Sequence, residues 1–453
     1  MNEKEVLGYS TLNINITNSI IQRVKDMIGL DFLFYELLQN ADDSNLQGKR
    51  ATHFVCRVYN DKIVINIDSV FTRCDKILEE CTWDNQNNKN IKTKKCDFHA
   101  ILEISSGNKD LITSNSNTKI EDIPIGKFGV GFLSVYQITS VPQIESNGLS
   151  LKIDPAAKQQ GTWTTSEILE ETKITLPFVK KNDDWTHGIN ISKEINNPDS
   201  VLKTFINCST ETLKFLKNIN KISIYYNDKL EHELIKSKTK ISEEIQVLEI
   251  TGNKTEKYLI INGISEMKNI DIFKENSDFL KKQRPAYYQI AIPIKDELNN
   301  SGKLFAFLPT ENYTHCPIDI NGMFFPLTSR KLIKFQNDFT NLEANWNSQI
   351  VKAAAKKFAK LANEILKIIG YKNFIFLLNS LRDLRNKSTS QNNLDYCMGL
   401  FWEEGKENFR ELKFVETIEK RIEKPENVVI LHNNAVKHFE MISKWSDRIT
   451  SED

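Results

Sequence analysis

The chain has 453 residues, of which 40% are hydrophobic and 26% are charged. This balance is typical of globular domains, and the length exceeds what one ordinary core can organise, so we expect two or three domains. Lysine plus arginine number 60 and aspartate plus glutamate number 60, which excludes a global positive field directed at nucleic acid. Because the sequence has neither a secretory leader nor the roughly eighteen apolar residues in a row that a spanning helix needs, we expect a cytoplasmic protein without a membrane partner.

The cysteines raise the question of a metal site. Seven cysteines in a chain of this length do not predict a disulfide framework. Cys74, Cys81, Cys96 and His99 lie near one another in sequence, but their gaps lack the paired spacing that makes zinc sites convincing. The sequence therefore favours unpaired thiols over a metal site.

Residues 19–43 predict a helix that contains the stretch ELLQNADD. At about 100° per residue, Glu36, Asn40 and Asp43 share one face of this helix, and apolar residues occupy the other. Taken alone, the segment is an amphipathic helix whose polar face is simply hydrated. The rest of the chain has to decide between that interpretation and a functional one.

The segments that follow alternate between strands and polar stretches. HFVCRVYN and KIVINID predict two antiparallel strands around a turn at residues 60–61, and the polar residues 82–95 suggest an exposed insertion. A short helix is expected in DFHAILEISSG. Strands are expected at LSLKI, residues 149–153, and at TKITLPFV, residues 172–179.

The second half begins with a predicted helix at residues 199–219. Short alternating strands follow in KISIYYN, EEIQVLEI, EKYLIIN, YYQIAIPI and KLFAFLP. From about residue 341 the pattern is helical, and Gly370 is the expected C-terminal stop of the clearest helix. We therefore divide the chain into domains at 1–197, 198–338 and 339–453.

A glycine-rich stretch, IGKFGVGF, suggests which ligand the polar face of the helix at 36–43 could contact. Gly126, Gly129 and Gly131 leave backbone amides bare at the start of a helical segment, which suits phosphate oxygens. By itself such a loop can equally be a tight turn beside a packed helix. Phosphates, however, need a divalent cation with oxygen ligands, and hydrolysis needs a carboxylate to handle water. The helix offers both groups.

These two stretches resemble the boxes of a known superfamily. ELLQNADD is similar to the E-x-x-x-N-x-x-D box, and IGKFGVGF to the lid-end box, of the GHKL ATPases: DNA gyrase, the ninety-kilodalton heat-shock chaperone, histidine kinases and MutL. EISSGNKD and TKITLPF resemble further motifs of the chaperone branch. Residues 303–333 resemble the segment that follows the ATPase unit in sacsin and in sacsin-like bacterial ATP-binding proteins. The resemblance covers roughly residues 15–350.

The resemblance implies an α+β fold. Its first domain would be a Bergerat-type ATPase sandwich, in which helices cover a mixed, mostly antiparallel sheet. A middle, transducer-like α/β domain and a helical C-terminal region would follow. ATP and Mg²⁺ are the implied cofactors.

The same resemblance implies roles for individual residues. Glu36 would be the general base, Asn40 would ligate Mg²⁺, and Asp43 would lie near the ribose or the lid. The remaining residues carried over as cofactor-binding are Ser106, Gly107, Asn108, Lys109, Gly126, Phe128, Gly129, Val130, Gly131, Phe132 and Thr172. Thr172 would sit beside the aspartate that binds adenine.

That aspartate lies where this sequence departs from the family pattern. The stretch INIDSVFTRCD lacks the glycine that usually follows the aspartate. Asp68 is our first candidate to accept the adenine amino group, while alignment on Phe71 would place Asn66 there. Further along, Arg330 would be the basic residue that reaches the γ-phosphate, with Lys331 as its neighbour in reserve. A surface arginine is the alternative interpretation of Arg330.

The function implied is Mg²⁺-dependent ATP binding and slow hydrolysis, with residues 108–126 as a lid whose closure rearranges the domains. The work would be chaperone-like or that of the ATPase in a bacterial anti-phage system, with ATP-dependent homodimerisation and a protein partner or client. One alternative is a degenerate nucleotide-binding scaffold that acts through protein partners. Another is a DNA-acting ATPase of the MORC or gyrase kind, which the neutral charge balance disfavours.

Overall fold

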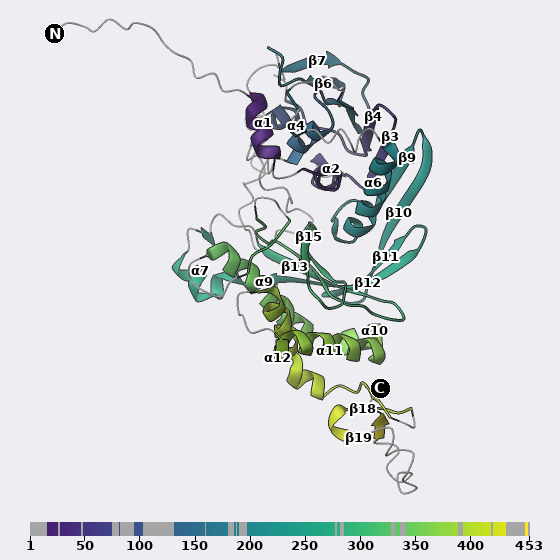
Figure 1. Ribbon diagram of the computed structural model, residues 1–453, viewed down its shortest axis with the longest axis vertical. Helices are drawn as coiled ribbons and strands as arrows, with labels where there is room; N and C mark the ends of the chain where they lie inside the picture. The colour runs from purple at the N-terminus through teal and green to yellow at the C-terminus, as the bar shows by residue number, and fades with distance from the viewer. Residues whose placement is uncertain are drawn as a thin grey trace, which may run out of the picture. The chain divides into compact units, whose positions relative to one another are not determined.

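A computed structural model gives the fold of the chain (Figure 1). It describes all residues except 1–15, 26–27, 47–48, 75–80, 82–94, 103–130, 159, 180–184, 187, 190–196, 277–278, 281–284, 328–330, 336–340, 388–392, 418–419, 432–448 and 452–453. The described residues form two compact units. The first holds those of 1–111, 124–209 and 221–233, and the second those of 210–220 and 234–453.

Unit 1 is built on a mixed, mostly antiparallel sheet. Its strands run in the order β9-β3-β4-β8-β5-β6-β7, and only the β3–β9 pair is parallel. The strands are β3 (His53–Val58), β4 (Lys62–Ile67), β5 (Gln143–Ser146), β6 (Leu149–Ile153), β7 (Gly161–Thr165), β8 (Thr172–Pro177) and β9 (Lys221–Tyr226). A separate short pair joins β1 (Asn45–Leu46) and β2 (Lys49–Arg50). The strands predicted at 149–153 and 172–179, and the antiparallel pair around residues 60–61, are confirmed.

The helices of unit 1 pack their apolar faces against this sheet. They are α1 (Ile16–Val24), α2 (Leu30–Asp42), α4 (Asp97–Leu102), the 3-10 helix η2 (Gly131–Gln137) and most of α6 (Pro198–Thr212). Phe34 of α2 meets Phe54 of β3 edge-on at 5.8 Å and Phe205 of α6 at 4.7 Å, which fixes α2 between the sheet and α6. The prediction of one helix over 19–43 is wrong, because Gly29 adopts φ +151° between α1 and α2.

Unit 2 contains a second set of sheet strands, which are also mostly antiparallel. The strands run in the order β15-β14-β16-β13-β12-β11-β10, with β14 and β16 parallel. They are β10 (Lys229–Lys240, which begins in unit 1), β11 (Ile245–Thr251), β12 (Thr255–Ser265), β13 (Ala286–Pro293), β14 (Lys303–Ala306), β15 (Leu308–Tyr313) and β16 (Asp319–Gly322). The single strand expected at KLFAFLP is a hairpin instead, because the chain reverses at Phe307 with φ 64°.

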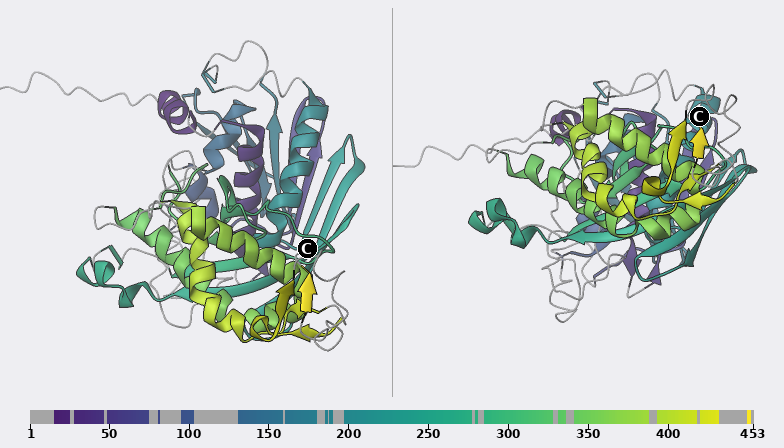
Figure 2. Two further views of the ribbon diagram at one scale, coloured as in Figure 1. Left: turned by 60° about the horizontal axis from the view of Figure 1, so that its bottom comes forward. Right: turned by 90° about the horizontal axis from the view of Figure 1, so that it is seen from below.

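Four helices pack on this second set of strands and on one another (Figure 2). They are α9 (Leu342–Lys360), α10 (Ala362–Ile369), α11 (Tyr371–Lys387) and α12 (Leu394–Arg410); Gly370 ends α10 as predicted. Shorter elements are η3 (Leu213–Phe215), η4 (Met267–Asn269), α7 (Asp271–Glu275) and η5 (Pro425–Asn427). The C-terminal region is not wholly helical, since it also contains the pairs β17 (Val415–Glu416) with β18 (Ile422–Glu423) and β19 (Val429–Leu431) with β20 (Ile449–Ser451).

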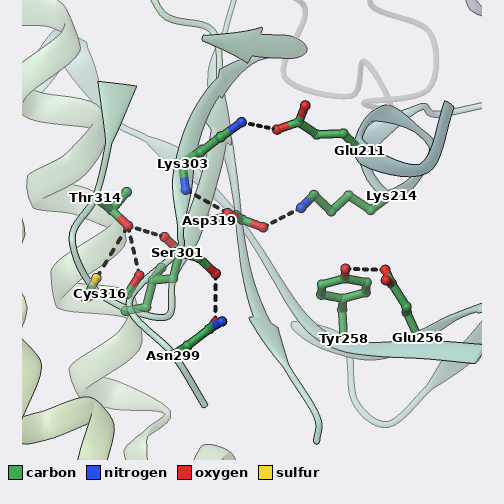
Figure 3. Close-up of polar contacts among 11 residues, drawn as sticks. Glu211, Lys214, Glu256, Tyr258, Asn299, Ser301, Lys303, Thr314, Cys316 and Asp319 are labelled. Atoms are coloured by element: carbon green, nitrogen blue, oxygen red, sulfur yellow. Dashed lines mark hydrogen bonds and ion pairs between the residues drawn. The ribbon is translucent and has the colours of Figure 1, made fainter. Parts of the chain in front are cut away.

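A buried ion pair joins η3 to β16 in unit 2 (Figure 3). Lys214 of η3 donates to the Oδ2 atom of Asp319 on β16 at 2.5 Å, and each side chain is only 9% exposed. The backbone amide of Lys303 donates to the other Asp319 oxygen at 2.8 Å. Two hydrogen-bonded partners thus offset the cost of burying this carboxylate.

Among the described residues, no helix combines the length and the apolar composition that crossing a bilayer requires.

Candidate functional site

The acidic helix α2 and the 3-10 helix η2 lie side by side in unit 1. The backbone amide of Gly29, just before α2, donates to the Oε1 atom of Gln137 at the end of η2 at 2.7 Å. Glu36, two turns along α2, meets Gly131 at the start of η2. The two helices are therefore antiparallel. Seven residues of α-helix span about 10 Å and six residues of 3-10 helix about 12 Å, so the two contacts fit one alignment.

Glu36 and Gly131 are in close contact. A Cβ atom placed on Gly131 would stand 1.9 Å from the Oε2 atom of Glu36, a distance that no pair of non-bonded atoms tolerates. Glu36 is 2% exposed, so its carboxylate is buried and the interpretation of α2 as a helix with a merely hydrated polar face is wrong at this position. A glycine at 131 is what leaves room for the carboxylate.

The other polar residues of α2 lie toward its C-terminal end. Asn40 and Asp43 are both half-buried, one and two turns beyond Glu36, and Asp43 is the residue that follows the last helical position. Phe132, next to Gly131 on η2, is also half-buried. The structure thus brings together the ends of two sequence boxes that are about ninety residues apart.

The side chain of Asp68 is held by hydrogen bonds at the start of β3. Its Oδ1 atom accepts hydrogen bonds from the backbone amides of Thr52 at 2.7 Å and His53 at 2.9 Å, and its Oδ2 atom accepts from the Thr52 hydroxyl at 2.5 Å. The carboxylate therefore caps the start of β3. The alternative residue, Asn66, accepts from Arg57 at 2.7 Å and donates to Glu171 at 2.6 Å.

A chain of hydroxyl groups links α2 to the strands beside Asp68. Ser44 bonds the carbonyl of Ala41 and the hydroxyl of Ser69, each at 2.7 Å. The Thr172 hydroxyl donates to the carbonyl of Ser69 and pairs with the hydroxyl of Ser146, each at 2.8 Å. Thr172 is fully buried. Because it bonds Ser69, the residue that follows Asp68, the positions of α2, the end of β4 and the start of β8 are coupled.

Several predicted site residues lie outside the described part of the chain. They are Ser106, Gly107, Asn108, Lys109, Gly126, Phe128, Gly129, Val130 and Arg330, together with the lid expected at 108–126. Lys331, the neighbour held in reserve, belongs to unit 2 and pairs with Glu311 at 3.4 Å.

Unit 1 also brings together the four residues for which the sequence favoured unpaired thiols over a metal site. The ligand atoms of Cys74, Cys81, Cys96 and His99 all lie within 4.8 Å of one another. One signal was available: only two residues separate Cys96 from His99, which is a short paired spacing after all. All seven cysteines lie in the described part of the chain, and none of them forms a disulfide.

Comparison with known proteins relates the chain to sacsin. Residues 14–175 match the family model described as "Sacsin domain". The chain is also 24% identical to human sacsin (Homo sapiens) over 356 residues, and this match covers 60% of the chain but only 8% of sacsin. The matched region contains α2, η2, Asp68 and the four-ligand cluster. The N-terminal part of this chain is therefore sacsin-like.

Proposed function

We propose that unit 1 binds ATP with Mg²⁺ and hydrolyses it slowly. The observation that carries the proposal is the packing of Gly131, the last glycine of the phosphate-binding box, against the buried carboxylate of Glu36. A base must lie within reach of the atoms on which it acts, and these two residues come from the two boxes that would hold the reacting groups. The sacsin-like relation adds support.

The donor set fits the proposed cofactors. The space that a Cβ atom on Gly131 would fill is taken by the Glu36 carboxylate, so this glycine lets the proposed base lie directly against the end of the glycine-rich box. Asn40, one turn from Glu36, would supply an amide oxygen to Mg²⁺, a cation that prefers oxygen ligands. The ion would neutralise charge on the phosphates when bound.

Glu36 would orient a water molecule and accept its proton. Its burial keeps bulk water away from the carboxylate, which strengthens any hydrogen bond that it makes to a reacting water. Because closure of a lid, rather than chemistry, is the expected output, we propose slow turnover and a change in the arrangement of the chain on ATP binding. Dimerisation and action on a protein client, chaperone-like or in anti-phage defence, are further parts of this proposal.

The proposal is tested by measuring ATP binding by calorimetry and phosphate release in parallel, with and without Mg²⁺. Glu36→Gln should keep ATP binding and lose hydrolysis by a factor on the order of 10² or more. Glu170→Gln is the matched control, since this glutamate of unit 1 is exposed whereas Glu36 is buried. Phosphate release that is equal in the parent and Glu36→Gln would exclude the assignment of the base.

One observation favours a second candidate, a nucleotide-binding scaffold without turnover. Both oxygens of Asp68 are already used at the start of β3, which leaves adenine without a dedicated free carboxylate at this position. Binding of ATP without phosphate release would support that scaffold, whereas no binding at millimolar ATP would exclude both ATP-based functions. DNA-dependent stimulation of phosphate release would instead favour the MORC-like or gyrase-like alternative.

A further inference from the structure

We propose that Cys74, Cys81, Cys96 and His99 form a structural zinc site. Three sulfur atoms and one imidazole nitrogen are a common donor set of closed, four-coordinate zinc. Soft thiolate ligands combined with histidine select zinc over the hard cations that bind phosphates. The proposal does not depend on the ATPase assignment, because none of these residues belongs to the proposed nucleotide site.

The distances between the ligand atoms suit one central ion. With Zn–S bonds of about 2.3 Å and a Zn–N bond of about 2.0 Å, the corners of a tetrahedral site lie about 3.8 Å apart for two sulfurs and about 3.5 Å for sulfur and nitrogen. The Sγ atoms of Cys81 and Cys96 are 3.9 Å apart, and the Sγ of Cys74 is 3.6 Å from the Nδ1 of His99. The Cys96–His99 pair is closer, at 3.0 Å. Small rotations of the side chains would equalise these edges.

Contacts that need no metal hold two of the three ligand-bearing segments together. Asp97, between Cys96 and His99, accepts from both the amide and the hydroxyl of Thr72 at 2.8 Å, and its own amide donates to that hydroxyl at 2.8 Å. Phe71 and Phe98 also pack edge to face at 5.4 Å. Cys74 is therefore placed against Cys96 and His99 by the fold itself, so binding an ion would require little reorganisation.

Cys81 completes the set and shows a contact suited to a thiolate. The backbone amide of Cys96 donates to the Sγ of Cys81 at 3.4 Å. Hydrogen bonds to ligating atoms orient them and tune the site. Cys74 and Cys96 are 3% and 0% exposed, while Cys81 and His99 are half-buried, which leaves the cluster shielded but with a route for an ion to enter.

The chemistry of loading is simple. One Zn²⁺ replaces the protons of three thiols and binds the neutral imidazole, so three protons are released and the loaded site carries one net negative charge. No oxidant or reductant takes part. The ion would tie Cys74 and Cys81 to Cys96 and to His99 in the first turn of α4, and would stabilise unit 1 rather than perform catalysis.

The test begins with the metal content of the full chain, purified without chelator and without a polyhistidine tag. Mass spectrometry of the metals should find one zinc per chain and little iron. Cys81→Ser and His99→Ala should each weaken zinc binding by a factor on the order of 10² or more, since even outer-shell changes cost 10- to 100-fold. Cys208→Ala, which removes a buried thiol of unit 1 outside the cluster, should keep the zinc.

A second measurement on the parent chain covers the case in which the variants fail to fold. Exchange of zinc for cobalt should give the visible absorption of a thiolate-bound Co²⁺, and a chelator should make Cys74, Cys81 and Cys96 reactive together toward N-ethylmaleimide. Three results would overturn the proposal: zinc retained in Cys81→Ser, stoichiometric iron in place of zinc, or a metal-free chain with a Cys81–Cys96 disulfide.

Discussion

Gly131 and Glu36, ninety-five positions apart in the sequence, approach so closely that a methyl group on the glycine would stand 1.9 Å from a carboxylate oxygen. This relationship joins the acidic helix to the end of the glycine-rich box. It also makes residue 131 a sensitive probe of the proposed site.

Gly131→Ala should therefore displace the Glu36 carboxylate. Movement of a catalytic group by about 1 Å can lower a rate by about 10², and overpacking of a tight site costs about 1–3 kcal/mol of stability. We expect phosphate release to fall strongly while the protein stays folded, as followed by release assays beside thermal unfolding. Gly188→Ala is the control, because its Cβ would meet Ile21 at an ordinary 3.4 Å. Unchanged phosphate release in Gly131→Ala would contradict the proposed role of this contact.

Asn40→Ala should act on binding rather than on the chemical step. Loss of the amide oxygen removes a proposed Mg²⁺ ligand, so the affinity for ATP should fall when Mg²⁺ is present and change little when it is absent. Calorimetric titrations with Mg²⁺ and with EDTA measure this difference. Equal losses in both conditions would show that Asn40 does not bind the metal.

Asp68→Asn distinguishes capping of β3 from binding of adenine as the main role of this residue. Because its oxygens accept three hydrogen bonds at the start of β3, the substitution should lower the free energy of unfolding by about 1–2 kcal/mol. If capping is its main role, the affinity for ATP should stay within about twofold of the parent. Chemical denaturation and calorimetry on the same preparations decide the matter, and a large loss of affinity without loss of stability would restore Asp68 as the adenine acceptor.

The ion pair of unit 2 predicts a stability effect far larger than that of a surface pair. Lys214→Met leaves the buried carboxylate of Asp319 without its cation and should cost about 3–5 kcal/mol. Lys274→Met, which breaks a pair whose carboxylate side chain is 87% exposed, should barely change the melting temperature. Thermal unfolding followed by circular dichroism compares the two variants, and the double variant Lys214→Met, Asp319→Asn should regain part of the loss.

His232 should make unit 1 less stable in mild acid. Burial lowers the pKa of this histidine below 6.5, and no described residue bonds its Nε2 atom. Above pH 6.5 the imidazole is neutral in both states. As the pH falls below 6.5, the unfolded chain takes up the proton more readily, so the free energy of unfolding decreases. The melting temperature should therefore drop less between pH 7.5 and 5.5 in His232→Leu than in the parent; an equal drop would assign the effect to other groups.

Local patterns predicted the elements well where one face of an element is buried. The alternation in HFVCRVYN and KIVINID gives β3 and β4, and Gly370 ends α10. Patterns failed where backbone conformation decided the outcome: Gly29 splits the first helix and Phe307 folds one apolar run into a hairpin. At the site, the helical period placed Glu36 and Asn40 on α2. The use of Asp68 as a cap and the gathering of Cys74 and Cys81 beside Cys96 and His99 depend on long-range packing that spacing alone does not encode.

The hydroxyl chain beside α2 has a direction. The Ser44 hydroxyl donates its hydrogen to the carbonyl of Ala41, so the Ser69 hydroxyl must be the donor to Ser44. In the same way, the Thr172 hydroxyl donates to the carbonyl of Ser69, so the Ser146 hydroxyl must be the donor to Thr172. Each hydroxyl hydrogen is thereby committed, while lone pairs remain. Because Ser69, Ser146 and Thr172 are at most 3% exposed, these hydrogens are used within the fold, and the chain serves to hold the end of α2 against the end of β4 and the start of β8.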